Sequence, residues 1–373
     1  MRFTLSSTPL SNKLLALSKV LNSRNTLPIL SDFLFTISSN KLTLTASDGE
    51  NTMETSIELN ENDGDGLFAI NGHDLLEAVK GISEQPITFD IKGDERIARI
   101  SYLNGLFSLP IDNAEDYPHT LEINEGATEI SIPSATLADC INRAIFATAL
   151  DEIRPVMNGI YFDLTPEHLA IVASDGHKLV RSKVFSVKAD TPASFILPKK
   201  PAGLLKNALG KEDDVTIRFN SSNAEIVFAE NKLSCRLIEG RYPNYNSVIP
   251  QNNPNVITIE RTALLSALRR VMPFANDASN LIRFRLEYNA LQLDAEDYDF
   301  AKNATERMQC DYNGTPMSIG FKGNAFVEVL SNVECQDVFI QLADPSRAGV
   351  VVPAEQPEGQ DILMLLMPML INE

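Results

Sequence analysis

Long apolar segments are missing from this sequence. No window approaches the roughly 18 apolar residues that a helix needs to span a bilayer. The N-terminal stretch MRFTLSSTPLSN lacks the apolar core of a signal peptide. The four cysteines stand far apart with no C-x-x-C pair, which favours reduced thiols over a disulfide framework. These absences predict a cytoplasmic protein that does not bind a membrane.

The motifs of common enzyme classes are absent as well. The sequence has no G-x-x-x-x-G-K-[ST] phosphate loop, no H-E-x-x-H zinc motif and no G-x-S-x-G elbow, and its four histidines are scattered. We therefore predict no catalytic residue, no metal site and no cofactor. One enzymatic alternative stays open, in which Asp175 and His177 act as an acid–base pair.

Basic residues are in the minority, because 32 Lys and Arg are set against 50 Asp and Glu and the formal charge is −18. Taken alone, this excess of acid argues against nucleic acid, since affinity for phosphate comes from Lys and Arg. The distribution of these charges along the chain favours the opposite conclusion. Thirteen of the basic residues but only five of the acidic ones, a net charge of +8, fall in six segments with helical patterns. The six segments are 8–25, 71–83, 134–150, 198–211, 260–275 and 322–333.

This bias has two interpretations. Surface helices can simply tolerate Lys, which is a good helix former. Glu is equally good, however, and this acidic chain has an excess of it to place. We therefore interpret the bias as helices that meet a polyanion, most simply duplex nucleic acid bound through its phosphates without sequence preference. The competing hypothesis is an acidic scaffold that binds peptides but not DNA.

One pattern occurs three times along the chain. LTLTASDGENTME, which begins at Leu42, and LAIVASDGHKLVR, which begins at Leu169, share ASDG at a separation of 127 residues. The chain start FTLSSTPLSNKLLAL matches segments that begin at Glu129 and Val256. Such self-similarity is typical of a repeat architecture. We predict three domains, 1–126, 127–252 and 253–373.

In each repeat, the spacing of the apolar residues changes between strand-like alternation and helix-like periodicity in the same order. A short alternating strand leads into an amphipathic helix, whose leucine stripe in the first repeat we assign to the core. Alternating strands follow, and Asp48-Gly49 marks a hairpin. A second strand, helix and set of strands complete the repeat. The predicted fold class is therefore α+β, with each domain built as βαβββ twice and its helices on one face of antiparallel sheet.

The chain ends in the apolar run ILMLLMPMLI, residues 362–371. Chain ends are usually polar and frayed, so this run is unusual. Either it is a buried strand, or it is a surface that something else binds.

Five motifs together resemble the bacterial DNA polymerase sliding clamps, the β subunits of the replicative DNA polymerase III. They are NTLPIL (25–30), ASDGHKL (173–179), ILPKK (196–200), EGRYPNYNSVIP (239–250) and LMPML (366–370). The likeness covers all three repeats in order. It implies the DNA clamp fold and a head-to-tail homodimer that closes a ring around duplex DNA. It also implies a non-catalytic processivity factor, which tethers the replicative polymerase, the clamp loader and repair proteins through short apolar peptides.

The resemblance also implies roles for individual residues. Four basic residues would contact DNA: Arg24, Lys199, Lys200 and Lys322. Phe107 and Leu109 would pack against Phe274 of the neighbouring chain, although a place in the core is an equal alternative for each aromatic residue. An outer peptide pocket would be formed by Arg154, Met157, Ser174, His177, Lys178, Leu179, Pro243, Val248, Arg347, Leu366, Met367, Pro368 and Met369.

A comparison of the repeats supports this pocket independently. Both copies of the hairpin share ASDG, which we assign to the fold. Only the second copy continues as His177-Lys178-Leu179, where the first has Glu50-Asn51-Thr52. Residues that one copy alone carries are candidates for function.

Overall fold

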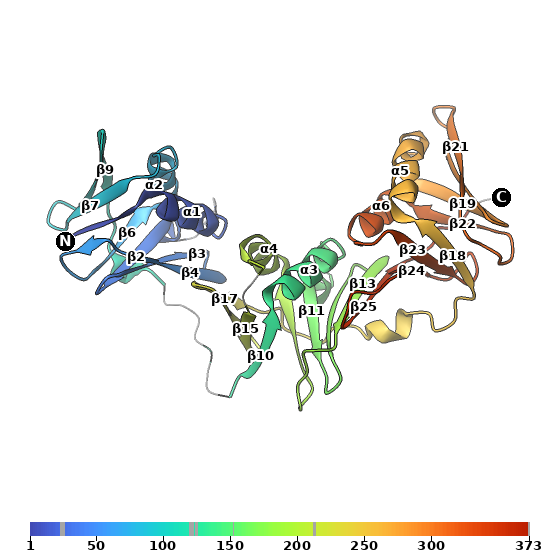
Figure 1. The fold of residues 1–373 in the computed structure, drawn as a ribbon, viewed down its shortest axis with the longest axis horizontal. Helices are drawn as coiled ribbons and strands as arrows, with labels where there is room; N and C mark the ends of the chain where they lie inside the picture. Colours follow the sequence, from blue (N-terminus) through green and yellow to red (C-terminus); the bar gives the residue numbers. More distant parts are fainter. Residues whose placement is uncertain (23–26, 119–122, 124–125, 152, 212–213, 372–373) are drawn as a thin grey trace. The chain divides into compact units, whose positions relative to one another are not determined.

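The computed structural model describes residues 1–22, 27–118, 123, 126–151, 153–211 and 214–371 (Figure 1). The chain forms two compact units, one of residues 1–137 with 203–237 and the other of residues 138–202 with 238–373. Within the described residues, every helix is too short or too polar to cross a membrane.

The first unit holds two antiparallel sheets. In spatial order, the strands of the smaller sheet are β5 (Glu61–Asn62), β1 (Arg2–Ser6), β7 (Pro86–Lys92), β8 (Ile97–Tyr102) and β9 (Gly105–Pro110). The strands of the larger sheet are β10 (Thr128–Pro133), β15 (Asp214–Phe219), β16 (Asn223–Phe228), β17 (Asn231–Arg236), β4 (Asn51–Glu58), β3 (Lys41–Ser47), β2 (Asp32–Ser38) and β6 (Gly66–Asn71).

The second unit also holds two antiparallel sheets. The strands of its larger sheet are β14 (Ala193–Pro198), β11 (Gly159–Leu164), β12 (Leu169–Ser174), β13 (Lys178–Val184), β25 (Gln360–Leu366), β24 (Gly349–Pro353), β23 (Asp337–Leu342) and β18 (Asn255–Glu260). The strands of its smaller sheet are β21 (Lys302–Gln309), β20 (Ala290–Asp297), β19 (Leu281–Glu287) and β22 (Met317–Lys322).

The described residues form six α-helices, α1 (Ser7–Ser18), α2 (Gly72–Val79), α3 (Ser134–Ile145), α4 (Lys199–Ala208), α5 (Arg261–Val271) and α6 (Gly323–Ser331). They also form short 3₁₀ helices, η1 (Pro28–Ser31), η2 (Ala114–Asp116), η3 (Pro155–Asn158), η4 (Tyr245–Val248) and η5 (Met272–Phe274). Figure 1 shows α1 beside α2 in the first unit and α5 beside α6 in the second.

The order of elements confirms the predicted repeat. Each third of the chain runs strand, helix and three strands, and then the same again, from β1 to β9, from β10 to β17 and from β18 to β25. The short strand β5 is the addition in the first third. The expected leucine stripe is also confirmed, because Leu10, Leu14 and Leu17 of α1 are fully buried.

Both larger sheets join strands from neighbouring repeats. In the first unit β17 of the second repeat pairs with β4 of the first, from Asn231 opposite Thr55 to Cys235 opposite Asn51. In the second unit β13 pairs with β25 of the third repeat over seven residues. The backbone ladders therefore continue across the predicted domain boundaries, and the compact units do not coincide with the repeats.

The two ASDG segments fold into the same turn. Asp48 Oδ1 accepts hydrogen bonds of 2.9 and 2.7 Å from the two backbone N–H groups after Gly49. Asp175 Oδ1 accepts two of 2.8 Å from those after Gly176. Both glycines have a φ of +90°, which L side chains rarely adopt. The turn thus explains why both copies need Asp-Gly, and it occupies the carboxylate of Asp175 that the enzymatic alternative required.

The helices are shorter than the six predicted segments, and this weakens the predicted charge bias. The described helices hold eight basic and four acidic residues, a net charge of +4. Lys19, Lys80, Lys211 and Lys322 lie just beyond helix ends. The bias remains opposite in sign to the whole chain, and it is concentrated in α4 and α5, which hold six of the eight basic residues.

A buried carboxyl group at the start of β2 makes the first unit sensitive to pH. The side chain of Asp32 is 3% exposed, and Asn71 Nδ2 donates to its Oδ1 over 3.5 Å. Burial, together with a hydrogen bond to and repulsion by Asp112, raises the pKa of Asp32 from 3.8 to about 7. At pH values between these two pKa values, the Asp32 carboxyl therefore keeps its proton in the folded chain but has lost it in the unfolded chain.

This difference predicts how stability depends on pH. Because the folded state binds the extra proton, the free energy of unfolding falls as pH rises from about 4 through 7. We expect Asp32→Asn to lose about 3 kcal/mol less stability than the parent between pH 4.5 and pH 8. Urea unfolding at the two pH values measures this, with the exposed Asp94→Asn as a control that should follow the parent. Parallel pH profiles for the parent and Asp32→Asn would contradict the assignment.

Candidate functional site

The C-terminal run is partly a buried strand and partly an exposed surface. In β25 the side chains of Met364, Leu365 and Leu366 are at most 3% exposed, and β13 pairs with the whole strand. Beyond the strand, Met367 is 40% exposed and Leu370 is 89% exposed. The buried-strand alternative therefore holds for residues 362–366, whereas residues 367–371 are at least partly exposed.

The exposed half of the run borders a cavity of about 360 Å³ in the second unit. Two backbone hydrogen bonds of 2.8 Å fix this tail, from Met367 N to His177 O and from Met369 N to Gly320 O. The cavity is lined by Asp175, His177, Lys178, Ala278, Ser279, Lys322, Asn324, Ala325, Glu328, Leu366, Met367, Pro368 and Met369. It thus lies between the β12–β13 turn, the tail and the start of α6.

The structure brings six of the thirteen predicted pocket residues into this cavity. They are His177, Lys178, Leu366, Met367, Pro368 and Met369. The other seven lie outside it: Met157 and Leu179 are buried, Ser174 belongs to the turn, and Arg154, Pro243, Val248 and Arg347 are exposed. The guanidinium group of Arg154 lies next to Gly176, on the turn that carries His177.

Sequence reasoning missed the residues that α6 and the loop before β19 contribute. Asn324 and Ala325 begin an ordinary amphipathic helix, and Ala278 and Ser279 lie in a polar loop, so none of them has a distinctive local pattern. The bridge between Gly320 and Met369 helps to bring the tail to them. No periodicity in the sequence signals that bridge.

The segment 239–250 does not line the cavity; its side chains pack against the strands next to the cavity. Tyr242, Tyr245 and Ile249 belong to a buried cluster that also contains Leu179 and Leu365. The ring of Tyr242 stacks on that of Tyr161 at 4.6 Å between centroids. Tyr245 Oη donates to Asp163 Oδ2 over 2.8 Å, and burial raises the pKa of the Tyr245 phenol. This motif therefore packs against β13, which follows the turn that carries His177, and against its neighbouring strand β25.

Ion pairs surround the cavity. Lys178 Nζ lies 2.6 Å from Glu328 Oε2 and 3.7 Å from Asp175 Oδ2, and 5.4 Å from the centre of the Phe146 ring. Its side chain is only 13% exposed. Lys178 thus links the β12–β13 turn to α6 and has little charge left for a ligand.

The predicted DNA contacts fall in different places. Lys199 and Lys200 are exposed at the start of α4. Arg24 lies outside the described residues, and Lys322 lines the cavity of the tail. Two further exposed residues of the helices, Lys206 in α4 and Arg269 in α5, have no ion-pair partner within the described residues. Sequence reasoning did not single these two out, although both belong to the counted basic residues.

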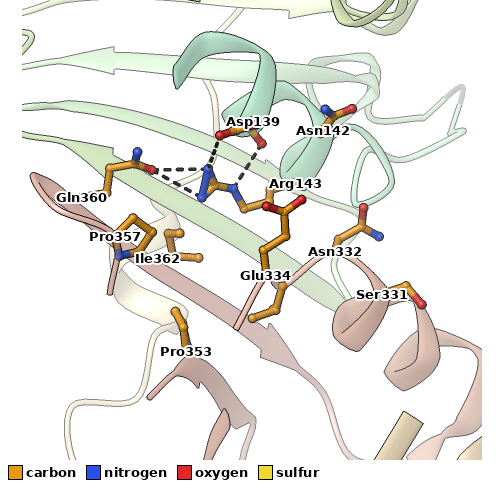
Figure 2. Close-up of a pocket in the computed structure, with 11 residues that line it drawn as sticks. Asp139, Asn142, Arg143, Ser331, Asn332, Glu334, Pro353, Pro357, Gln360 and Ile362 are labelled. Atoms are coloured by element: carbon orange, nitrogen blue, oxygen red, sulfur yellow. Dashed lines mark hydrogen bonds and ion pairs between the residues drawn. The ribbon is translucent and has the colours of Figure 1, made fainter. Parts of the chain in front are cut away.

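Arg143 shows that a basic residue on a helix is not always available to a ligand. Figure 2 shows it between α3 and β25, beside a cavity of about 340 Å³. Its Nε donates to the backbone oxygen of Asp139 over 3.1 Å, and its terminal nitrogens lie 3.4 and 3.3 Å from Gln360 Oε1. Because the residue is only 9% exposed, it joins α3 to β25 rather than meeting a polyanion.

Two of the three predicted dimer residues lie at a sheet edge, and the third lies in η5. Phe107 and Leu109 are half-buried on β9, an edge strand of the first unit, and Phe274 is 40% exposed in the second unit. The Phe107 ring stacks on Tyr102 at 5.4 Å between centroids. Leu103 and Leu106, at 86% and 62% exposed, extend the apolar surface of this edge and were not predicted.

Comparison with known proteins matches the chain from end to end. Three family models match in order: the N-terminal domain of the DNA polymerase III beta subunit at residues 1–122, the central domain at 131–244 and the C-terminal domain at 246–370. The chain belongs to the DNA polymerase III beta subunit family. The members of this family are sliding clamps, which are non-catalytic processivity factors.

Individual relatives agree with this assignment. The chain is 28% identical to the beta sliding clamp of Salmonella typhimurium over 372 residues, 99% of this chain and 100% of the relative. It is 26% identical to the beta sliding clamp of Escherichia coli over 371 residues, with the same coverage. The crystal structure of a sliding clamp from Pseudomonas aeruginosa bound to griselimycin has a TM-score of 0.94, with 25% identity and full coverage of both chains. The predicted family, clamp fold and non-enzymatic role are thus confirmed.

Proposed function

We propose that this sliding clamp encircles duplex DNA as a head-to-tail homodimer and that it docks its partners at the cavity beside the C-terminal tail. Domains 1–126, 127–252 and 253–373 of two chains would form a ring of six. The replicative polymerase, the clamp loader and repair proteins would insert short apolar peptides into the cavity. We also propose a cytoplasmic location, with which the free thiols of Cys140, Cys235, Cys310 and Cys335 agree.

The observation that carries the ring is that each of the two smaller sheets has one outer strand, β9 or β21, with an open edge. Strand β9 ends one sheet in the first unit and β21 ends one in the second, and each lacks a strand partner on its outer side within the described residues. Unpaired edges invite pairing with another chain. A head-to-tail contact between β9 of one chain and β21 of another, repeated once, covers both edges and closes the assembly.

The charge distribution supports duplex DNA as the ligand of the ring. The helices carry +4 in a chain of −18, and Lys199, Lys206 and Arg269 are exposed on them. Contacts of exposed lysine and arginine with phosphate are weak and independent of sequence. A closed ring holds DNA by topology, so weak contacts are sufficient for retention and still allow sliding.

The experiment that tests this function compares circular and linear DNA. Purified protein, loaded by its clamp loader onto nicked circular duplex, should remain bound during gel filtration. Cutting the circle once should release it through the free ends. Equal retention on the two forms would indicate ordinary binding, and an absence of retention on both would favour the peptide-binding scaffold.

Disruption of the β9 edge should give monomers. We expect the parent to have about twice the 41.1 kDa mass of one chain in light scattering. Phe107→Asp with Leu109→Asp should have the mass of one chain, because two buried carboxylates without partners cost several kcal/mol at an interface. Val227→Asp, which changes an exposed apolar residue on the interior strand β16, is the control and should leave the dimer intact. A dimeric double variant would remove β9 from the interface.

A further inference from the structure

Lys322 lies beside the C-terminal tail, although the family resemblance implies a DNA contact for it. It is the last residue of β22 and directly precedes α6, and its exposed side chain lines the same cavity as His177 and Met367. A DNA contact and a docked peptide are different uses for this ammonium group. The surroundings of Lys322 favour the peptide.

The tail lies against β22, and Lys322 shares a cavity with an exposed apolar residue of the tail. Gly320 and Met369 form an antiparallel bridge. Lys322, two residues after Gly320, lines the same cavity as Met367, two residues before Met369. Met367 is 40% exposed and is held from its other side by the hydrogen bond to His177 O. An apolar contact surface and an ammonium group therefore stand next to each other in one cavity.

The other basic residues near the tail already have acidic partners. Lys178 pairs with Glu328 over 2.6 Å. Of the predicted pocket residues outside the cavity, Arg154 pairs with Asp151 over 2.9 Å and Arg347 with Asp344 over 3.0 Å. Within the described part of the chain, Lys322 has neither an ion pair nor a side-chain hydrogen bond. Its charge is therefore available to a ligand.

The start of α6 adds to the positive potential at this point. Lys322 is the N-cap residue, and its side chain makes no capping hydrogen bond. The N-terminus of a helix carries a partial positive charge, which falls off within the first turn. Asn324 and Ala325 of that turn line the cavity as well. Asp175 and Glu328 also line the cavity but pair with Lys178, so Lys322 and the helix start are the groups beside the tail that favour a carboxylate.

We infer that Lys322 is a specificity-determining residue of the cavity and pairs with an acidic side chain of the docked peptide. This inference rests on the proposed peptide docking. Apolar contacts with Met367 and its neighbours supply most of the affinity, and the ion pair discriminates among peptides that share an apolar run. Because the pair is exposed, the discrimination is modest, about threefold to fivefold in Kd.

The test uses acetylated and amidated heptapeptides, which carry no terminal charge. Each has a central Leu-Leu-Phe run and either Asp or Asn at one of the flanking positions. Isothermal titration compares the parent with Lys322→Gln and Lys322→Glu. The parent should bind at least one Asp peptide about threefold to fivefold tighter than its Asn counterpart. Lys322→Gln should abolish this preference, and Lys322→Glu should invert it.

Controls separate this inference from the proposed function. Lys188→Gln, which changes an exposed lysine between β13 and β14, should keep the preference for Asp. If Lys322→Gln keeps it too, or if the parent has none while the peptides still bind, the inference fails and peptide docking stands. If no peptide binds the parent, both fail. Retention of Lys322→Gln on circular DNA should equal that of the parent, and a loss of retention would assign Lys322 to DNA instead.

Discussion

Reversal of the charge at the start of α4 should release the protein from circular DNA. Lys199 and Lys200 are adjacent and exposed, so Lys199→Glu with Lys200→Glu replaces two positive charges by two negative ones in each chain. Phosphate would then be repelled at a position where the parent attracts it. We expect at least a tenfold loss of retention on nicked circles at about 0.1 M salt. Adding Arg24→Glu should deepen the loss.

The matched control reverses the same number of charges elsewhere. Lys41 and Lys188 are exposed but lie outside the helices, at the start of β3 and between β13 and β14. Lys41→Glu with Lys188→Glu gives the same net charge as the test variant, so it separates local contact from overall repulsion. Both variants should remain dimers in light scattering. If the two lose retention equally, net charge rather than α4 governs binding to DNA.

Removal of the exposed tail should abolish tight docking of peptides. Deleting residues 367–373 leaves β25 intact up to Leu366 but removes Met367, Pro368 and Met369 from the cavity. It also removes the two backbone hydrogen bonds that hold the tail beside His177 and Gly320. Loss of three apolar side chains at a contact surface should weaken binding by at least tenfold, or about 1.4 kcal/mol. Fluorescence anisotropy with a labelled polymerase-derived peptide measures this.

Two controls separate a loss of peptide binding from a general effect of truncation. A shorter deletion of residues 372–373 keeps Met367, Pro368 and Met369 in the cavity and should bind like the parent. The melting temperature should change little for either variant, because the buried part of the run remains paired with β13. An unaltered isotherm for the longer deletion would mean that the tail serves the fold alone.

The local rules of the sequence predicted the local structure well. Asp-Gly predicted the turn that Gly49 and Gly176 form with φ of +90°, because few residues other than glycine adopt that conformation. The leucine spacing predicted the buried face of α1. Helix ends were less predictable. Lysines such as Lys19 and Lys322 fit the helical pattern but lie beyond the last or first helical residue, so the charge bias was overestimated.

The long-range pairings could not be predicted from the residues alone. Strand β13 pairs with β25 across about 180 positions of sequence, and both are apolar strands that could have joined other partners. The cavity depends on that pairing and on the bridge between Gly320 and Met369. His177 and Met367 could be predicted as site residues from the sequence because their motifs are distinctive. Ala325 and Glu328 were not, since an alanine and a glutamate on a helix are unremarkable until the tail lies across them.

The ladders that cross from one repeat to the next have a consequence for dissection of this chain. Excision of the middle repeat would expose the hydrogen-bonding sides of both β17 and β13, which β4 and β25 now cover. Unpaired strand edges of this kind readily form hydrogen bonds with strands of other molecules. The repeats thus share one sequence pattern but are not independent folding units. A fragment cut at the apparent domain boundaries would have two unpaired strand edges and would tend to aggregate.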